Sequence, residues 1–279
     1  MEFVNCINKT LTTNYLNQAL IMESYNKVWR IFFAFSLAAI AVQQVICGVF
    51  KEAIMPPWPV IITGSMACIW IFSLVLFLAN TAIIINANAR AIAFYMGWVF
   101  LAMFIGFHLP YQIKNNLYSL GAWTNSLKLF AYSGGAFIVA ASFPKKLGSA
   151  VNADCFVPMG RIFFGIMLIV FGIEHFVYLP FVATLVPVWM PGGQIFWTYF
   201  AGVALIGGGI GIALNIQLRI IANLVGIMIF LWFIMLHIPR AIADPHSDHG
   251  NEITSVFEAL GFSGIAFLIA GTGKQKLFM

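Results

Sequence analysis

Charged residues are scarce in this sequence, and their scarcity excludes a water-soluble fold. Only 8% of the 279 residues are Asp, Glu, Lys or Arg, whereas a soluble domain carries about 25% because its surface must stay hydrated. Hydrophobic residues make up 62% of the chain. Several runs of about 20 of them lack any charge, which is the length that crosses the hydrocarbon core of a bilayer. The composition therefore predicts an all-α, polytopic membrane protein.

Motifs for paired thiols and electron carriers are also missing. The four cysteines, Cys6, Cys47, Cys68 and Cys155, are scattered without a CxxC pair, which excludes chemistry that needs two close thiols. The sequence has no haem-binding CxxCH, no flavin or nicotinamide fingerprint and no cysteine cluster, so any electron carrier must come from a partner. The net charge of +5 includes no basic run, and nucleic acid is not expected as a partner.

Hydropathy predicts eight membrane-spanning helices. They cover roughly residues 30–50, 59–79, 91–109, 127–143, 160–180, 195–214, 219–238 and 255–271. An even number of spans puts both termini on one side, and that side receives ten of the 14 Lys and Arg residues. The positive-inside rule then places both termini in the cytoplasm and makes the chain a multi-pass protein of the cell (inner or plasma) membrane.

The chain contains an internal repeat. WRIFF at 29–33 recurs as GRIFF at 160–164, HLP at 108–110 recurs as HIP at 237–239, and AFIVA at 136–140 recurs as AFLIA at 266–270. Each repeat holds four spans, so the two repeats have the same orientation. We expect an N-terminal cytoplasmic or interfacial segment (1–28), a degenerate first four-helix bundle (29–143), a cytoplasmic linker (144–159), a second four-helix bundle (160–271) and a cytoplasmic tail (272–279).

Five features distinguish the second repeat: RIFFG (161–165), FGIEHF (171–176), LVPVWMP (185–191), a glycine-rich sixth span and HIPRA (237–241). Together they resemble the DoxX-like membrane proteins. The resemblance covers residues 155–271 and extends more weakly, through the repeat, to 29–143. It implies a four-helix membrane bundle as the unit. It also implies a connection to membrane redox chemistry, as in thiosulfate:quinone oxidoreductase subunits and oxidative-stress complexes.

Ionisable residues gather near the predicted outer ends of the second-repeat helices. Glu174 and His175 lie about 20 Å along the fifth span, where an ionisable group is costly unless it is paired or hydrated. His237 and Arg240 end the seventh span, and we expect these four residues to form a proton-exchanging site. The first repeat has glutamines at the places of Glu174 and His175, so the site is expected only in the second. The alternative is that all four are ordinary polar groups at helix ends.

Two further residues are candidates for cofactor binding. Trp189 lies in an apolar loop with three prolines that either admits a lipid-soluble ligand or anchors the chain at headgroup depth. Glu258 is expected to face the mouth of the second bundle. His246, Asp248 and His249 are candidate metal ligands, but their spacing matches no established motif. A solvated loop is the favoured interpretation there, and a bound metal is not expected.

These features predict a membrane component of a quinone-linked redox system. Glu174 and His175 are expected to exchange protons with the quinone, while His237 and Arg240 stabilise an anionic form. Whether the chain is itself an oxidoreductase stays open, because it encodes no electron carrier. The alternatives are a small-molecule transporter that uses the same outward-facing pocket and a non-enzymatic subunit that anchors partner proteins. The expected partners are membrane lipid and a redox subunit.

Overall fold

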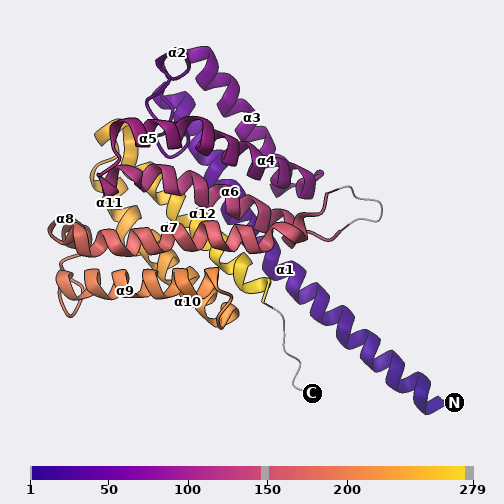
Figure 1. Cartoon of the computed structure of the whole chain (residues 1–279). Coiled ribbons are helices and arrows are strands. Elements are labelled where there is room, and N and C mark those ends of the chain that lie inside the picture. The colour runs from indigo at the N-terminus through magenta and orange to yellow at the C-terminus, as the bar shows by residue number, and fades with distance from the viewer. Residues whose placement is uncertain (1, 146–150, 274–279) are drawn as a thin grey trace.

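The protein folds into helices throughout the part that the structure describes. The computed structural model covers residues 2–145 and 151–273, and no strand occurs within these ranges. Seven of the described helices are long and apolar enough to cross a membrane. Many of their large hydrophobic side chains are exposed, including Leu74, Val203 and Leu224, which suits contact with lipid. The prediction of an all-α, multi-pass membrane protein is confirmed (Figure 1).

In chain order, the described α-helices are α1 (Glu2–Cys47), α2 (Val60–Thr63), α3 (Met66–Ile84), α4 (Ala89–Met103), α5 (Leu109–Asn115), α6 (Thr124–Ser142), α7 (Val157–Val177), α8 (Leu179–Leu185), α9 (Gln194–Ala213), α10 (Leu218–Trp232), α11 (Ile238–Ala243) and α12 (Asn251–Gly271). Two π-helical segments, η1 (Phe104–His108) and η4 (Phe233–His237), join α4 to α5 and α10 to α11. The 3-10 turns η2 (Leu120–Trp123), η3 (Ala153–Phe156) and η5 (Ser247–Gly250) precede α6, α7 and α12.

The count of eight spans is not confirmed, and the difference lies in α6. This helix corresponds to the fourth predicted span and has 19 residues, but it is not among the seven that are apolar enough. It carries Lys128 and several Ser, Thr and Gly residues, and most of its side chains are buried. α6 packs against α4 and α7 and also touches α12. Its polar groups therefore meet other helices rather than lipid, which a membrane-embedded helix tolerates.

The long helices form a closed ring in sequence order. α1 packs against α3, α4 against α6, α6 against α7, α7 against α9 and α10 against α12, with smaller contacts between α3 and α4 and between α9 and α10. The ring closes where α12 packs along α1, and α6 and α12 also meet across its centre. The two repeats thus share a long interface, and equivalent helices, α6 and α12, lie in the middle of it.

The internal repeat is preserved in details of the backbone. The π-helical segments Phe104–His108 and Phe233–His237 occupy equivalent places. The turns before α4 and α10 both contain left-handed residues, with Asn86 and Asn215 at φ 60°. In each half a proline follows within the first two residues of the next helix. Since proline has no N–H to donate, the helix preceding it widens locally.

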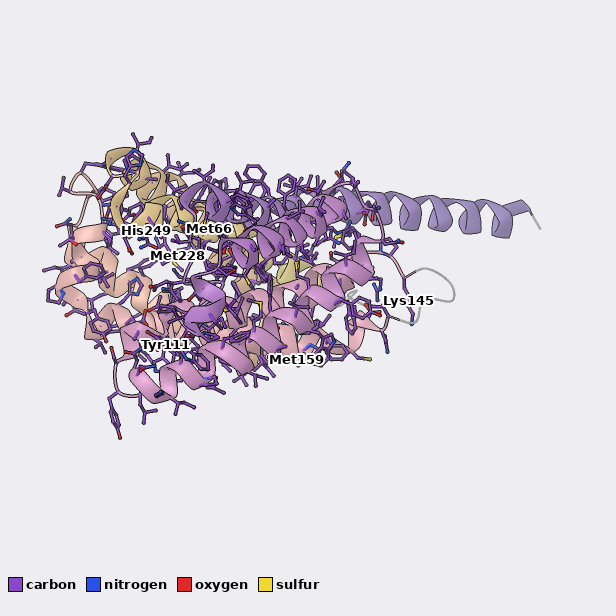
Figure 2. All side chains as sticks on the ribbon, turned by 90° about the horizontal axis from the view of Figure 1, so that it is seen from above. Met66, Tyr111, Lys145, Met159, Met228 and His249 are labelled. Atoms are coloured by element: carbon purple, nitrogen blue, oxygen red, sulfur yellow. The ribbon has the colours of Figure 1, made fainter. Side chains whose placement is uncertain are left out.

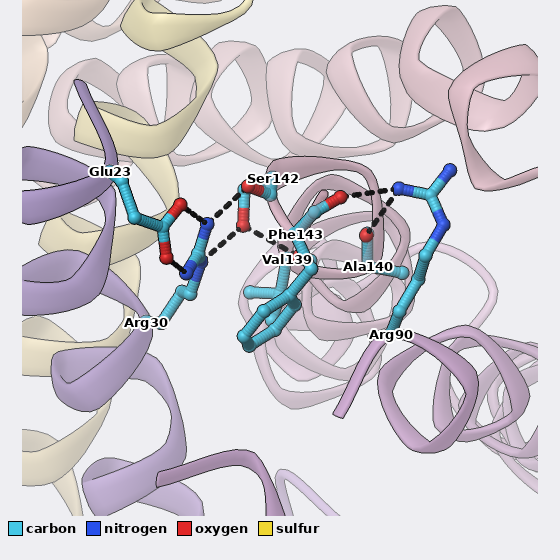
Figure 3. A network of polar contacts seen from close by, with 7 residues as sticks. All are labelled: Glu23, Arg30, Arg90, Val139, Ala140, Ser142 and Phe143. Atoms are coloured by element: carbon cyan, nitrogen blue, oxygen red, sulfur yellow. Dashed lines mark hydrogen bonds and ion pairs between the residues drawn. The ribbon is translucent and has the colours of Figure 1, made fainter. Parts of the chain in front are cut away.

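Two arginines bind the last turn of α6 (Figure 3). Arg30 of α1 forms an ion pair with both carboxylate oxygens of Glu23, at 2.6 and 3.0 Å, and also hydrogen bonds to Ser142. Arg90 of α4 donates to the carbonyl oxygen of Phe143 at 2.6 Å. The last carbonyls of a helix lack partners within it, and these guanidinium groups satisfy them and complement the negative end of the helix dipole. We call this end of the bundle the arginine end.

The opposite end of the bundle, which we call the histidine end, carries His249. Figure 2 shows His249 and Lys145 far apart, at opposite ends of the helices. At the arginine end, Gly271 of α12 lies beside Met22 and Asn26 of α1. This arrangement agrees with the predicted topology, whereas the cytoplasmic location of the arginine end stays a prediction. Parts of the expected linker and tail, residues 146–150 and 274–279, lie outside the described residues.

The N-terminal segment continues directly into the first span. α1 is one helix from Glu2 to Cys47, and its candidate membrane span begins at Ile21. In Figure 1 the first part of α1 extends away from the other helices. No break marks the boundary expected at residue 28, because residues 2–47 contain neither glycine nor proline to interrupt the helix.

Paired glycines bring α7 and α9 into backbone contact. A Cβ on Gly165 would lie 2.7 Å from the carbonyl oxygen of Gly209, and a Cβ on Gly209 would lie 2.6 Å from that of Gly165. Gly172 approaches the carbonyl oxygen of Gly202 in the same way, at 2.7 Å. Small residues allow helices in a membrane to gain packing contacts by close approach. The glycine-rich sixth span is therefore a helix-packing surface.

We predict that Gly209→Ala lowers the free energy of unfolding by about 1–3 kcal/mol, because the added methyl forces α7 and α9 apart. Gly207→Ala is the matched control, since a Cβ at Gly207 meets nothing within 4 Å, and it should leave stability unchanged or slightly higher. Unfolding curves in the same detergent measure both. Equal stability of the two variants would contradict the glycine contact.

Candidate functional site

Glu174 makes a hydrogen bond across the boundary between the repeats. Its Oε1 accepts from the Thr124 hydroxyl at 2.9 Å, which joins the end of α7 to the start of α6. The counterpart bond exists in the other half, where Gln43 Oε1 accepts from the Thr254 hydroxyl at 2.9 Å. The same contact is therefore built with a neutral amide in one half and an ionisable carboxyl in the other. The contact itself does not require a charge at Glu174.

His175 faces away from Glu174. Its Nδ1 lies 2.7 Å from the carbonyl oxygen of Phe171, one turn earlier in α7, and its ring stacks on Trp232 of α10 with centroids 6.1 Å apart. Adjacent residues on an α-helix do not face each other, so Glu174 points to α6 while His175 points to α10. The structure does not bring these two predicted site residues together.

A buried ion pair joins the two central helices. Lys128 Nζ of α6 lies 2.7 Å from Glu258 Oε2 of α12, and the two side chains are only 14% and 5% exposed. Lys128 and Glu258 are counterparts in the repeat, 130 residues apart, so the pair lies where the two halves meet each other symmetrically. Sequence analysis missed Lys128 as a site residue. The signal was available, because opposite charges at equivalent positions of two packed repeats indicate a pair.

Arg240 and His237 lie close to this ion pair. Arg240 forms a two-pronged ion pair with Glu252, with Nε 2.9 Å from Oε2 and Nη2 bonded to Oε1. His237 has a buried Nδ1 that finds no hydrogen-bond partner among the described residues. The charges of Lys128, Glu252 and Arg240 all act on the His237 imidazole. A buried histidine with an unused ring nitrogen is suited to form a hydrogen bond with a polar ligand.

These residues form one charged cluster at the histidine end, built from α6, α7, η4, α11 and α12. We define the charged cluster as Thr124, Lys128, Glu174, His237, Arg240, Glu252 and Glu258. It contains three of the four predicted catalytic residues and Glu258. Ionisable side chains inside a membrane protein are costly and are therefore a strong indication of function. The cluster can hold and exchange protons and can stabilise a polar or charged ligand.

The other predicted site residues lie outside the charged cluster. Trp189 is 65% exposed in the loop between α8 and α9. His246, Asp248 and His249 lie in or next to η5, where Asp248 and His249 have positive φ values of 45° and 53°. In the parts of the chain that the structure describes, no three His, Cys, Asp or Glu side chains are grouped closely enough to hold a metal ion.

A groove of about 760 Å³ runs along α1 between α3 and α12. Its walls are mainly apolar and include Phe35, Ile46 and Phe257. Phe35 and Ile46 are 49% and 78% exposed, so the groove opens on a surface that faces lipid. At the histidine end it is bordered by His246 and His249. Sequence analysis missed this groove, because three helices from both repeats build it.

The fold and the site thus define a multi-pass, all-α membrane protein with a partly buried charged cluster. A family model described as a domain of unknown function (DUF8561) matches residues 164–257, which is less than half of the chain and lies within the second repeat. No curated protein and no solved structure matches the chain. The resemblance to the DoxX-like proteins therefore stays a prediction.

We predict that Lys128→Met destabilises the protein by about 3–5 kcal/mol, because it leaves the buried Glu258 carboxylate without a counter-charge. The double variant Lys128→Met/Glu258→Met should recover most of this loss, since replacing a whole buried pair by apolar groups is often neutral. Lys114→Met, which changes an exposed lysine, is the control. Chemical unfolding of the four proteins measures the effect. A double variant as unstable as the single one would show that the two charges do not interact.

Proposed function

We propose that the protein is a membrane component of a quinone-linked redox system and that the groove along α1 binds the quinone. The chemistry of the groove is the observation that carries this proposal. It is a mainly apolar cavity of about 760 Å³ on a lipid-facing surface, with two imidazoles at one end. Ligand sites are typically apolar cavities of about 300–1,000 Å³ with a few polar groups. A quinone has the matching parts, a long apolar tail and a ring with two carbonyl oxygens.

In this proposal the quinone ring lies at the histidine end of the groove, beside His246 and His249. An imidazole N–H donates a hydrogen bond to a carbonyl oxygen and can deliver a proton when that oxygen gains negative charge. Reduction of a quinone to a quinol takes up two electrons and two protons. The protons reach the ring through the imidazoles, and the electrons come from a redox partner, because the sequence contains no carrier motif.

Helix α12 connects the groove to the charged cluster. Ile253 and Phe257 line the groove, whereas Thr254 and Glu258, on another face of the same turns, are buried. In this arrangement Glu174, His237 and Arg240 do not contact the quinone. They lie on the other side of α12 from the groove and supply charge and exchangeable protons there. This is a supporting role, whereas the sequence predicted direct contact with the quinone.

We predict that Ala39→Trp, which places an indole in the groove, weakens quinone binding at least about tenfold, equivalent to 1.4 kcal/mol. Ile166→Trp adds the same group to an exposed position on α7 and should bind quinone as the unmodified protein does. Binding of decylubiquinone to protein embedded in lipid nanodiscs measures the effect, with melting temperatures to establish folding. Unchanged binding in folded Ala39→Trp protein would overturn the groove as the quinone site.

A small-molecule transporter coupled to protons is the second candidate function. One observation favours it: both halves have a π-helical interruption at the same place, and the interruption in the second half leads into the charged cluster. Interrupted helices in corresponding positions of two repeats often mark a transport site at the repeat interface.

For this candidate, Glu174→Gln is the informative change, because Gln43 makes the counterpart bond to threonine without a charge and the fold should persist. Protein in vesicles with a trapped pH-sensitive dye should then conduct protons about 10²-fold more slowly, the usual minimum loss when an acid–base group is removed. Glu52→Gln removes an exposed carboxyl group at the histidine end and is the control. Equal proton flux in all three proteins would rule out a proton pathway through Glu174.

A further inference from the structure

Two buried polar atoms at the centre of the protein lack hydrogen-bond partners. Tyr132 of α6 is fully buried, and its hydroxyl bonds to no described residue. Glu258 of α12 is 4% exposed and uses Oε2 in the ion pair with Lys128, while its Oε1 is buried and unpartnered among the described residues. Neither atom has a part in the proposed quinone site.

Ser36 of α1 completes the surroundings of these atoms. A Cβ at Gly261 would collide with Ser36 Oγ and would lie 3.1 Å from the Tyr132 hydroxyl oxygen, so both hydroxyls border the same point of α12. Gly261 is three residues after Glu258, which places it on the same side of the helix. Ser36 donates its hydrogen to the carbonyl oxygen of Phe33 at 2.9 Å, which leaves the Ser36 oxygen free to accept.

The repeat indicates that this polar set is not needed for packing. On the other side of the interface, the counterparts of Ser36, Tyr132 and Gly261 are Met167, Phe262 and Ala131. Tyr132 and Phe262 pack against each other with ring centroids 4.7 Å apart. The two hydroxyl groups thus have apolar counterparts on the other side of the interface, and the counterpart of Glu258 is Lys128.

We propose that Glu258, Tyr132 and Ser36 bind an internal water molecule that holds an exchangeable proton between the two repeats. Buried polar atoms are nearly always hydrogen-bonded, and a buried water typically makes about three bonds. Here the water oxygen accepts from the Tyr132 hydroxyl, and its two hydrogens bond to Glu258 Oε1 and Ser36 Oγ. An added proton on this water passes to Glu258 Oε1, while Oε2 keeps its bond to Lys128. The site does not depend on a quinone in the groove.

Infrared difference spectra of the purified protein in H₂¹⁶O and H₂¹⁸O test the proposal, because only water bands shift with the oxygen isotope. The unmodified protein, without added quinone, should give an isotope-sensitive O–H band from buried water. Tyr132→Phe removes one bond to that water, and its band should be lost or shifted. Gly261→Ala adds the methyl that the counterpart Ala131 already has, which pushes Ser36 Oγ away, and the band should be lost or shifted.

Gly207→Ala is the matched control, since its new methyl meets nothing, and it should keep the band. Melting temperatures establish folding, and if Gly261→Ala does not fold, the nearly isosteric Tyr132→Phe decides alone. The same band in folded Tyr132→Phe and Gly261→Ala protein, or no such band in the unmodified protein, would overturn the proposal. Because no quinone is present, the outcome is independent of binding in the groove.

Discussion

The two halves meet at Lys128 and Glu258, and the need to balance charge at this buried point constrains how they pack. The two residues are counterparts, and counterpart residues near the axis of a symmetric interface contact each other. Two identical charges at this buried position would repel and could not be stabilised by each other. The halves must therefore differ here if both residues are charged, and the pair, with its partners only 2.7 Å apart, lies where α6 and α12 meet.

Around this centre the two halves differ in how closely their first two long helices pack. In the second half, Gly165 and Gly172 of α7 lie against glycines of α9, and this brings the two helices into backbone contact. The corresponding positions of α1 and α3 are Ala34, Ala41, Ser73 and Asn80, whose side chains do not permit the same approach. The groove lies along α1, in the less tightly packed half, and most of the charges lie in the other. Neither site belongs to one repeat alone, because α12 lines the groove and Lys128 of α6 belongs to the charged cluster.

The sequence was sufficient for the positions of the long helices and for the repeat, because hydropathy and recurring motifs depend on local residues. The fourth predicted span corresponds to α6 and is not confirmed as a span, since a helix that other helices surround can be as polar as its neighbours allow. Lys128 was not among the predicted site residues, although its counterpart Glu258 was. Glu174 and His175 are adjacent in the chain, but helix geometry points them to different neighbours. The groove could not be predicted, because its shape depends on the distances between helices, which no local sequence pattern contains.

The closure of the ring makes the groove and the charged cluster parts of one structure. The segment that leads into α12 is held against α1 by Gln43, which donates to the Gly250 carbonyl oxygen at 2.7 Å, and by Lys51, which donates to that of His249. The same helix carries Glu258 to Lys128 about two turns further along. A molecule that enters the groove must pack against Ile253 and Phe257, and any shift of α12 that it causes changes the distance between the buried charges. A ligand in the lipid-facing groove and a proton at the repeat interface are therefore expected to affect each other through α12, as reciprocal coupling between two sites requires.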